Sequence, residues 1–271
     1  MQKSQKIVLI TGSSSGMGRQ TAIFLAEQGF MVYAGSRTPE KLMDVESKNL
    51  KAVALDVTDV QNLTTLLKRI KRIDILINNA GYGLVSTIED LDEKEMFNQF
   101  NVNVFGVLRV CQAVIPLMRK EKYGVIINIS SFLGKIGLPL LTLYNASKYA
   151  VEGITDSLRY ELRDFNIRVH SLMPGFFDTQ FARSNLVTNL KTFDTRSPYA
   201  QMVKNLVPNI IKQINDGNEA TEVAEMILKI IENENFSARA TVGDKASKFI
   251  PMRQELSDED FERRVREYYS L

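Results

Sequence analysis

Tyr144 and Lys148 stand four residues apart, which places a phenol and an ammonium group on one face if this segment is helical. A phenol has an ordinary pKa of about 10 and is a poor acid–base group at neutral pH. A neighbouring cation favours the phenolate and lowers that pKa towards the range in which enzymes work. The Ser131 hydroxyl, thirteen residues before Tyr144, could hydrogen-bond a carbonyl oxygen and polarise it. A tyrosine and a lysine at this spacing are also common on helix surfaces, so the pair needs support from its surroundings.

A turn rich in glycine and serine, residues 11–18, separates the first expected strand from the first expected helix. Glycine permits a tight turn and lets backbone N–H groups approach a pyrophosphate at the positive end of the helix. The spacing is not the GxGxxG of the common dinucleotide fingerprint, and the turn alone could be an ordinary loop. Its place after the first strand of a β/α series favours dinucleotide binding, through Gly12, Ser14, Ser15, Gly16, Met17 and Gly18.

The second expected strand is followed by Arg37, close to the place where many dinucleotide-binding proteins carry an acidic residue. A carboxylate there binds a ribose 2′-hydroxyl, whereas a guanidinium group is suited to a 2′-phosphate. We therefore expect NADP(H) rather than NAD(H) as the cofactor. The alternative is that Arg37 is a solvated side chain without a ligand.

Short β-branched runs alternate with helix-length amphipathic segments along the chain. This alternation predicts βαβ units and a parallel sheet with helices on both faces. We expect one α/β domain over residues 1–271, a doubly wound parallel sheet of about seven strands. The expected strands are Lys6–Thr11, Phe30–Ala34, Leu50–Leu55, Ile73–Ile77, Gly124–Ile129, Ile167–Met173 and Arg239–Val242, and the expected helices are Gly16–Gln28, Pro39–Lys48, Val60–Arg72, Asp92–Lys120 and Leu143–Phe165.

The rhythm breaks between Gly175 and Gly217, where prolines recur and helix signals are weak. Long unpatterned stretches in compact domains are usually lids or binding loops, so we expect a substrate lid at residues 176–217. Residues 244–271 are expected to form a C-terminal extension that ends in an amphipathic helix. Its expected N-cap is Ser257, and its apolar face comprises Phe261, Val265 and Tyr268.

Composition excludes several classes of protein. Apolar residues make up 44% of the 271 residues, and 34 basic side chains face 32 acidic ones. The apolar content and the net charge of +2 exclude a disordered chain and give no support for nucleic-acid binding. The one cysteine, Cys111, excludes a disulfide framework, and no metal site is expected. The apolar runs are strand-sized and no apolar signal region is present at the N-terminus, so we expect a cytoplasmic protein without a membrane span.

With these motifs the chain resembles the short-chain dehydrogenase/reductase family, in its single-domain branch with a Rossmann-type fold. The family's motifs occur in order between residues 6 and 180. The glycine motif TGxxxGxG matches Thr11, Gly12, Gly16 and Gly18, and the motif YxxxK matches Tyr144 and Lys148. Further matches are the NNAG segment at residues 78–81, the adenine-contacting pair Asp56 and Val57, the active-site Asn103 with Gly106, the catalytic Ser131, and Pro174, Gly175 and Thr179 of the PGxxxT segment.

The resemblance implies hydride transfer between a nicotinamide and a carbonyl or secondary alcohol. Tyr144 would protonate the developing alkoxide, while Lys148 would bind the nicotinamide ribose and lower the pKa of the tyrosine. Ser131 would hold the substrate oxygen, and Asn103 would anchor a water relay behind the lysine. Besides the glycine turn, Arg37, Tyr144 and Lys148, the implied cofactor contacts are Asp56, Val57, Asn79, Ala80, Gly81, Pro174, Gly175, Phe177 and Thr179.

The resemblance also bears on assembly. In this family the helix that contains the position of Cys111 and the helix that carries Tyr144 commonly pair across a dimer axis. A homodimer or homotetramer is therefore implied. Cys111 itself lies among apolar neighbours and is expected to be a core or interface side chain.

The apolar side chains of the expected lid predict a small hydrophobic substrate. The C-terminal part resembles retinol and 17β-hydroxysteroid dehydrogenase-like members, which also continue past the seventh strand. Two alternatives stay open: a 3-oxoacyl thioester reductase, and a non-catalytic NADP-binding sensor, against which the intact set of catalytic residues argues. The apolar candidates are Phe176, Phe177, Phe181, Leu186, Leu190 and Phe193, together with Leu133, Leu138 and Tyr82.

Overall fold

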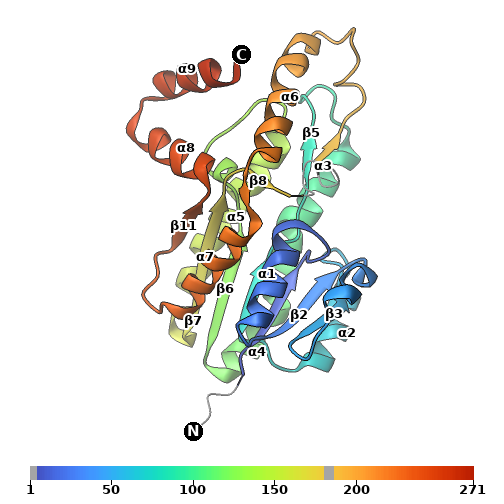
Figure 1. The fold of residues 1–271 in the computed structure, drawn as a ribbon, viewed down its shortest axis with the longest axis vertical. Helices are drawn as coiled ribbons and strands as arrows, with labels where there is room; N and C mark the ends of the chain where they lie inside the picture. Colours follow the sequence, from blue (N-terminus) through green and yellow to red (C-terminus); the bar gives the residue numbers. More distant parts are fainter. Residues whose placement is uncertain (1–4, 180–185) are drawn as a thin grey trace.

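Seven parallel strands form the central sheet of the computed structural model, which describes residues 5–179 and 186–271 (Figure 1). Their order is β11-β7-β6-β4-β1-β2-β3, and every neighbouring pair is parallel. The expected doubly wound, Rossmann-type sheet is confirmed. The strands are β1 (Ile7–Thr11), β2 (Met31–Ser36), β3 (Leu50–Ala54), β4 (Ile75–Asn78), β6 (Gly124–Ile129), β7 (Ile167–Pro174) and β11 (Arg239–Val242).

Helices cover both faces of the sheet, which is why its central strands are apolar on both sides. On β1, Val8 and Ile10 enter one hydrophobic cluster, whereas Leu9 between them enters the opposite one. Figure 1 shows α1 and α7 lying together in front of the sheet. These two helices are α1 (Gly16–Glu27) and α7 (Ala220–Glu232), and the opposite cluster receives side chains from α2 (Val60–Ile70), α4 (Gly106–Glu121) and α5 (Thr142–Glu161).

The long helix expected over Asp92–Lys120 consists of α3 (Glu93–Phe100), a π-helical turn η2 (Asn101–Phe105) and α4. Asp92 and Glu95 begin it with a capping box. By length and composition alone the stretch Glu93–Glu121 could cross a membrane, with a mean hydropathy of 1.4 in its most apolar window. This is weak evidence for a span, because core helices pass the same test and the apolar side of α4 packs on the sheet.

A third apolar cluster lies beyond the carboxyl end of the sheet, where Figure 1 shows α6, α8 and α9. The region expected to be an unpatterned lid contains a regular helix, α6, which buries Leu206, Val207, Ile210 and Ile214. Its Pro208 obscured the helical pattern, but this residue faces solvent. The elements here are α6 (Ala200–Asn215), α8 (Asp244–Glu255), α9 (Asp258–Tyr269) and two parallel strand pairs, β5 (Gly83–Val85) with β9 (Leu186–Thr188) and β8 (Phe177–Asp178) with β10 (Asn218–Glu219).

The C-terminal extension confirms the expected cap and refines the expected face. Ser257 Oγ accepts a hydrogen bond from the Asp260 N–H at 3.1 Å and so begins α9. Phe261 and Val265 are buried as expected, but the fully buried aromatic at the end of the helix is Tyr269, with Tyr268 only partly covered. Helix α8, which precedes α9, was not expected. The helix expected at Pro39–Lys48 is a shorter 3₁₀ helix, η1 (Pro39–Val45).

Candidate active site

A cleft of about 640 Å³ opens at the carboxyl ends of the central strands, where ligands bind in open α/β sheets. We call it the polar cleft. Most residues expected to contact a cofactor line it: Gly12, Ser14, Ser15, Gly16, Met17, Gly18, Arg37, Asp56, Val57, Asn79, Ala80, Gly81, Tyr144, Lys148 and Thr179.

The glycine turn of the polar cleft is locked to the loop after β4. Thr11 Oγ1 accepts hydrogen bonds from the N–H groups of Asn79 and Ala80, each at 3.0 Å. Asn79 Nδ2 donates in return to the carbonyl oxygen of Gly12 at 2.9 Å. Gly12 has a φ of +69°, and a Cβ there would lie 2.7 Å from Ala80 Cα. The turn therefore requires glycine, and this close-packed backbone cradle at the start of α1 fits a pyrophosphate.

Arg37 and Asp56 are two side chains of opposite charge that line the polar cleft. Arg37 follows β2 with an exposed side chain, and its neighbour Ser36 accepts a hydrogen bond from the Thr38 N–H at 3.0 Å. Asp56 Oδ1 accepts hydrogen bonds from the N–H and the hydroxyl of Thr58 at 2.8 and 2.7 Å. The guanidinium group is thus the charged group that the end of β2 offers to an anionic ligand.

Ser131 and Tyr144 meet through their hydroxyl groups. Ser131 follows β6 and caps the short helix η3 (Phe132–Gly134), with its Oγ accepting a hydrogen bond from the Leu133 N–H at 3.1 Å. Tyr144 lies in the first turn of α5, and a hydrogen bond joins its side chain to that of Ser131. Burial raises the pKa of the Tyr144 phenol to about 12, and the hydrogen bond to Ser131 lowers it in part. The phenol is therefore a protonated acid at neutral pH.

Lys148 lies one helical turn after Tyr144 and is buried. Its Nζ donates to the carbonyl oxygen of Ile129 at 2.8 Å and lies 5.7 Å from the centroid of the Tyr144 ring. Burial lowers the pKa of Lys148 to about 8, and the Glu152 carboxylate opposes this change. The Tyr144 pKa is thus raised by burial, with Ser131 as the group that opposes this change, and not lowered by Lys148 as the motif led us to expect.

Asn103 lies in the π-helical turn η2, where it joins two parts of the site. Its Nδ2 donates to the carbonyl oxygen of Tyr82 at 2.9 Å and to Ser147 Oγ at 3.0 Å, and its Oδ1 accepts from the Tyr82 N–H at 3.1 Å. π-Helical turns are frequent at functional sites, since they redirect side chains that a regular helix would align. Asn103 is buried behind the cleft and ties the loop after β4 to α5 beside Lys148.

A second, largely apolar pocket adjoins the polar cleft, and we call it the apolar pocket. The two share Met17, Ser130, Tyr144 and Thr179. The expected residues Ser131, Pro174, Gly175 and Phe177 line this pocket rather than the cleft. Its remaining lining residues are Leu133, Leu141, Phe176, Leu186, Ile210 and Ile214.

The expected lid side chains divide between the apolar pocket and solvent. Phe176 and Leu186 line the pocket, but Leu190 is 85% exposed and Phe193 is also exposed. Phe181 lies outside the described residues. Of the other apolar candidates, Leu133 lines the pocket, Tyr82 lines the polar cleft, and Leu138 is part of the apolar cluster behind them.

Sequence reasoning missed several residues that the fold brings to the site. Ile210 and Ile214 come from α6, whose pattern was not recognised. In the polar cleft the missed residues come from the ends of the central strands, from the short strands β5 and β9, and from α3 and η2, and position after a strand could have indicated only the first of these groups. They are Ser36, Leu55, Thr58, Leu84, Glu95, Asn98, Asn101, Val102, Ile129, Ser130 and Val187. Among the described residues no group of three histidine, cysteine, aspartate or glutamate side chains could hold a metal ion.

Comparison with known proteins gives matches over most of the chain. A family model described as short chain dehydrogenase matches residues 6–189. A 3-ketodihydrosphingosine reductase from Bacteroides thetaiotaomicron is 38% identical over 245 residues, which are 88% of each chain. A short-chain dehydrogenase from Streptomyces avermitilis has a TM-score of 0.84 at 29% identity, over 99% of this chain and 98% of the other. One from Burkholderia cenocepacia, in complex with NADP, has a TM-score of 0.75 at 27% identity over 98% of both chains.

Proposed function

The chain belongs to the short-chain dehydrogenase family, and we propose that it transfers a hydride between NADP(H) and a carbonyl or secondary alcohol of a small hydrophobic substrate. The observation that carries the proposal is the pairing of Ser131 with Tyr144 where the polar cleft meets the apolar pocket. A carbonyl group placed there has two hydroxyl donors for its oxygen and an apolar surface for the rest of the molecule.

In the reductive direction the chain supplies the proton and NADPH, when bound, supplies the hydride. Ser131 donates a hydrogen bond to the carbonyl oxygen and polarises the C=O bond. As the oxygen becomes an alkoxide, Tyr144 transfers its phenolic proton to it and is left as a phenolate. The Lys148 ammonium group, one turn along α5, stabilises that phenolate and binds the nicotinamide ribose. Asn103 holds the loop after β4 against α5, and the tyrosine is then reprotonated from solvent.

Arg37 supports NADP(H) over NAD(H). Its exposed guanidinium group stands beside the polar cleft at the end of β2, where a 2′-phosphate would lie. Asp56 and Val57 would contact the adenine, and the glycine turn from Gly12 to Gly18 would bind the pyrophosphate. The nicotinamide would be in contact with Pro174, Gly175, Phe177 and Thr179.

The apolar pocket supports a hydrophobic substrate, with residues 176–217 as its lid. Its lining comes mainly from aliphatic and aromatic side chains, and none of the described residues that line it is charged. The relative from B. thetaiotaomicron is named as the reductase of a keto compound, which supports reduction as the working direction.

We propose the cytoplasm as the compartment and a homodimer or homotetramer as the assembly. Cys111 is a buried core side chain, and burial raises the pKa of its thiol to about 12, so it remains an inert thiol. Phe97, Phe105 and Leu108 are exposed on α3, η2 and α4, which is the surface that pairing through these helices would cover. Mass measurement in solution tests the assembly, and a monomer at micromolar concentration would contradict it.

The test of the reaction is a panel of aromatic, steroidal and long-chain ketones and acetoacetyl thioesters, offered with NADPH and with NADH. We expect NADPH oxidation with hydrophobic ketones, and loss of turnover with retained NADPH binding in Tyr144→Phe. Preference for acetoacetyl thioesters would favour the 3-oxoacyl reductase. Tight NADPH binding without oxidation across the panel would instead indicate a non-catalytic sensor.

A further inference from the structure

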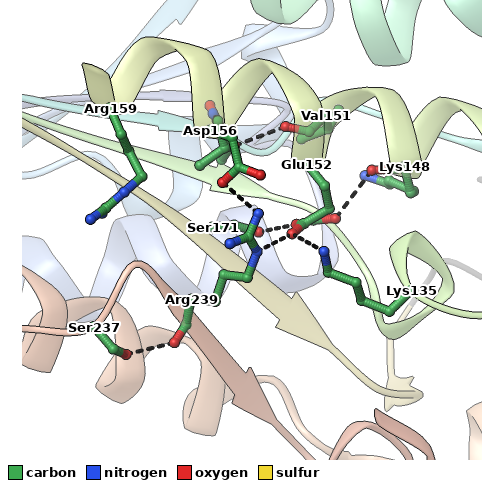
Figure 2. Close-up of polar contacts among 12 residues, drawn as sticks. Lys135, Lys148, Val151, Glu152, Asp156, Arg159, Ser171, Ser237 and Arg239 are labelled. Carbon is green, nitrogen blue, oxygen red and sulfur yellow. Dashed lines mark hydrogen bonds and ion pairs between the residues drawn. The ribbon is translucent and has the colours of Figure 1, made fainter. Parts of the chain in front are cut away.

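A buried carboxylate, Glu152, lies one helical turn after Lys148 on α5 and is only 4% exposed. Figure 2 shows three side chains from other segments converging on it. Arg239 Nε donates to Glu152 Oε2 at 2.7 Å, Lys135 Nζ lies 3.4 Å from the same oxygen, and the Ser171 hydroxyl donates to Oε1. The carboxylate therefore has partners on both oxygens.

Two of the three partners of Glu152, Lys135 and Ser171, come from segments that also carry residues of the site. Lys135 directly follows η3 and lies four residues after Ser131. Ser171 lies on β7, three residues before Pro174, which lines the apolar pocket. One carboxylate thus connects the serine-bearing turn and the strand leading to the pocket with the helix that carries the tyrosine and the lysine.

The turn that follows Ser131 packs closely against α5 at Gly134. A Cβ on Gly134 of η3 would lie 2.7 Å from Ser130 Oγ, 3.1 Å from the Lys148 carbonyl oxygen and 3.3 Å from Glu152 Cγ. The turn after Ser131 is therefore seated on the part of α5 that contains both Lys148 and Glu152. A change at Glu152 would act on both sides of this contact.

Several charged side chains lie around Glu152 and Lys148. The charged and titratable groups that face this part of α5 from the packed elements are Tyr144, Lys148, Glu152 and Asp156 of α5, Lys135 after η3, and Arg239 of β11. Arg239 Nη2 also contacts Asp156 Oδ1 at 2.6 Å, but Asp156 is 51% exposed. Of the two carboxylates in this group of described residues, Glu152 is the buried one, so solvent screens its charge much less than that of Asp156.

We propose that Glu152 is a positioning residue for the reaction: it keeps the Lys148 ammonium group charged in its buried site and holds the Ser131 turn against α5. The inference rests on the proposed function, because it is hydride transfer that requires a charged lysine and a fixed serine. A buried ion pair is by itself weak evidence for a contribution to stability. Its adjacency to Lys148 and its link to the Ser131 turn give this one a functional reason.

Loss of the Glu152 charge should change how activity depends on pH, in a direction set by Lys148 and Tyr144. Activity falls as pH rises through the pKa of Lys148, since the neutral amine no longer stabilises the phenolate. Glu152 raises that pKa against the effect of burial. Without the Glu152 charge, the lysine loses its proton at lower pH, and the nearby Tyr144 phenolate is also favoured. Both changes move the alkaline limit of carbonyl reduction to lower pH.

The variant that tests the proposal is Glu152→Gln, which keeps the shape and removes the charge. We expect the alkaline limb of its kcat profile to move down by about one pH unit, the effect of losing one nearby opposite charge. The matched control is Asp156→Asn, which removes the other carboxylate on Arg239 from the same helix. Its limb should coincide with that of the wild type. If the alkaline limb of the kcat profile lies at the same pH in Glu152→Gln as in the wild type, the proposal is overturned, even if kcat itself falls.

Lys135→Met provides a second test if Glu152→Gln does not fold. This lysine is 35% exposed, and its removal leaves the Glu152 charge less neutralised. The alkaline limb should then move to higher pH, and a limb that stays or moves down contradicts the inference.

Measuring NADPH affinity over the same pH range separates this inference from the proposed function. Affinity should fall at lower pH in Glu152→Gln than in the wild type, whatever the substrate. A wild-type protein that neither binds NADPH nor reduces any carbonyl refutes the proposed function. A functional wild type with unchanged limbs in the variants refutes only the role of Glu152.

Discussion

The polar cleft is held by hydrogen bonds between backbone groups and short polar side chains, whereas the apolar pocket is held by side-chain packing. At the cleft, Thr11 and Asn79 fix the glycine turn through donors and acceptors on two adjacent loops. At the pocket, Phe176 packs edge-on against Phe132, and Ile210 packs into the same cluster from α6. The first arrangement tolerates almost no change in backbone position, and the second tolerates changes of side chain at modest cost. Tyr144 belongs to both.

The largest effect is expected at Tyr144, one of the four residues that the two regions share. Tyr144→Phe removes the proton donor and should lower kcat by about 10²–10⁴-fold, the contribution of a positioned general acid. NADPH affinity, measured by fluorescence titration, should stay close to that of the wild type because the ring is retained. Retained turnover would contradict the assignment of Tyr144 as the acid.

The next largest effect is expected where the cleft permits no side chain. Gly12→Ala places a Cβ against Ala80 at a φ of +69°, and should lower the free energy of unfolding by roughly 1–3 kcal/mol and weaken NADPH binding. Gly153→Ala is the matched control. Beyond the backbone of α5 itself, no described atom lies within 4 Å of its Cβ position, so alanine there should leave NADPH binding unchanged and stabilise the helix slightly. Chemical denaturation of both variants compares them, and equal losses would contradict the account of the turn.

Arg37→Gln tests which phosphate the cleft recognises. Loss of a charge-assisted hydrogen bond should weaken NADPH binding by about tenfold while NADH affinity changes little. Dissociation constants for both cofactors measure this. If the wild type binds NADH as tightly as NADPH, the preference for NADP(H) is wrong.

The smallest effect is expected in the apolar pocket. Ile210→Val removes one methylene group from its wall and should raise KM for a hydrophobic ketone about fourfold, corresponding to about 0.8 kcal/mol. NADPH affinity should not change. Ile211→Val, on the exposed side of the same helix, should leave both constants unchanged. A rise in KM that is equal in the two variants would indicate that α6 acts through stability and not through contact.

The same contrast explains how far the sequence could be read. The glycine turn and the Tyr144–Lys148 pair were predicted because their residues lie within one turn or one helix and have few geometric solutions. The apolar pocket was predicted only in outline. Helix α6 was not predicted because it contains Pro208, a residue that usually interrupts helices. Leu190 and Phe193 of the expected lid are exposed, whereas Ile210 and Ile214 of α6 line the pocket.

Two features of the site depend on contacts between distant segments and could not be read from spacing. Glu152 is one, since its partners lie at positions 135, 171 and 239 and meet only in the folded protein. The pKa of Tyr144 is the other. The spacing of tyrosine and lysine predicts a lowered value, but burial of the phenol raises it to about 12. Desolvation is a property of the packed site and not of a motif.

Hydride transfer from the nicotinamide is the central claim, and isotope labelling tests it directly. NADPH deuterated at the transferring position of its C4 is incubated with the wild-type protein and a hydrophobic ketone from the panel, and the product is analysed by mass spectrometry. The account predicts an alcohol that carries one deuterium on the former carbonyl carbon, and about 10²–10⁴-fold slower formation of that product with Tyr144→Phe. An alcohol formed without deuterium, or no oxidation of NADPH with any carbonyl compound, would contradict it.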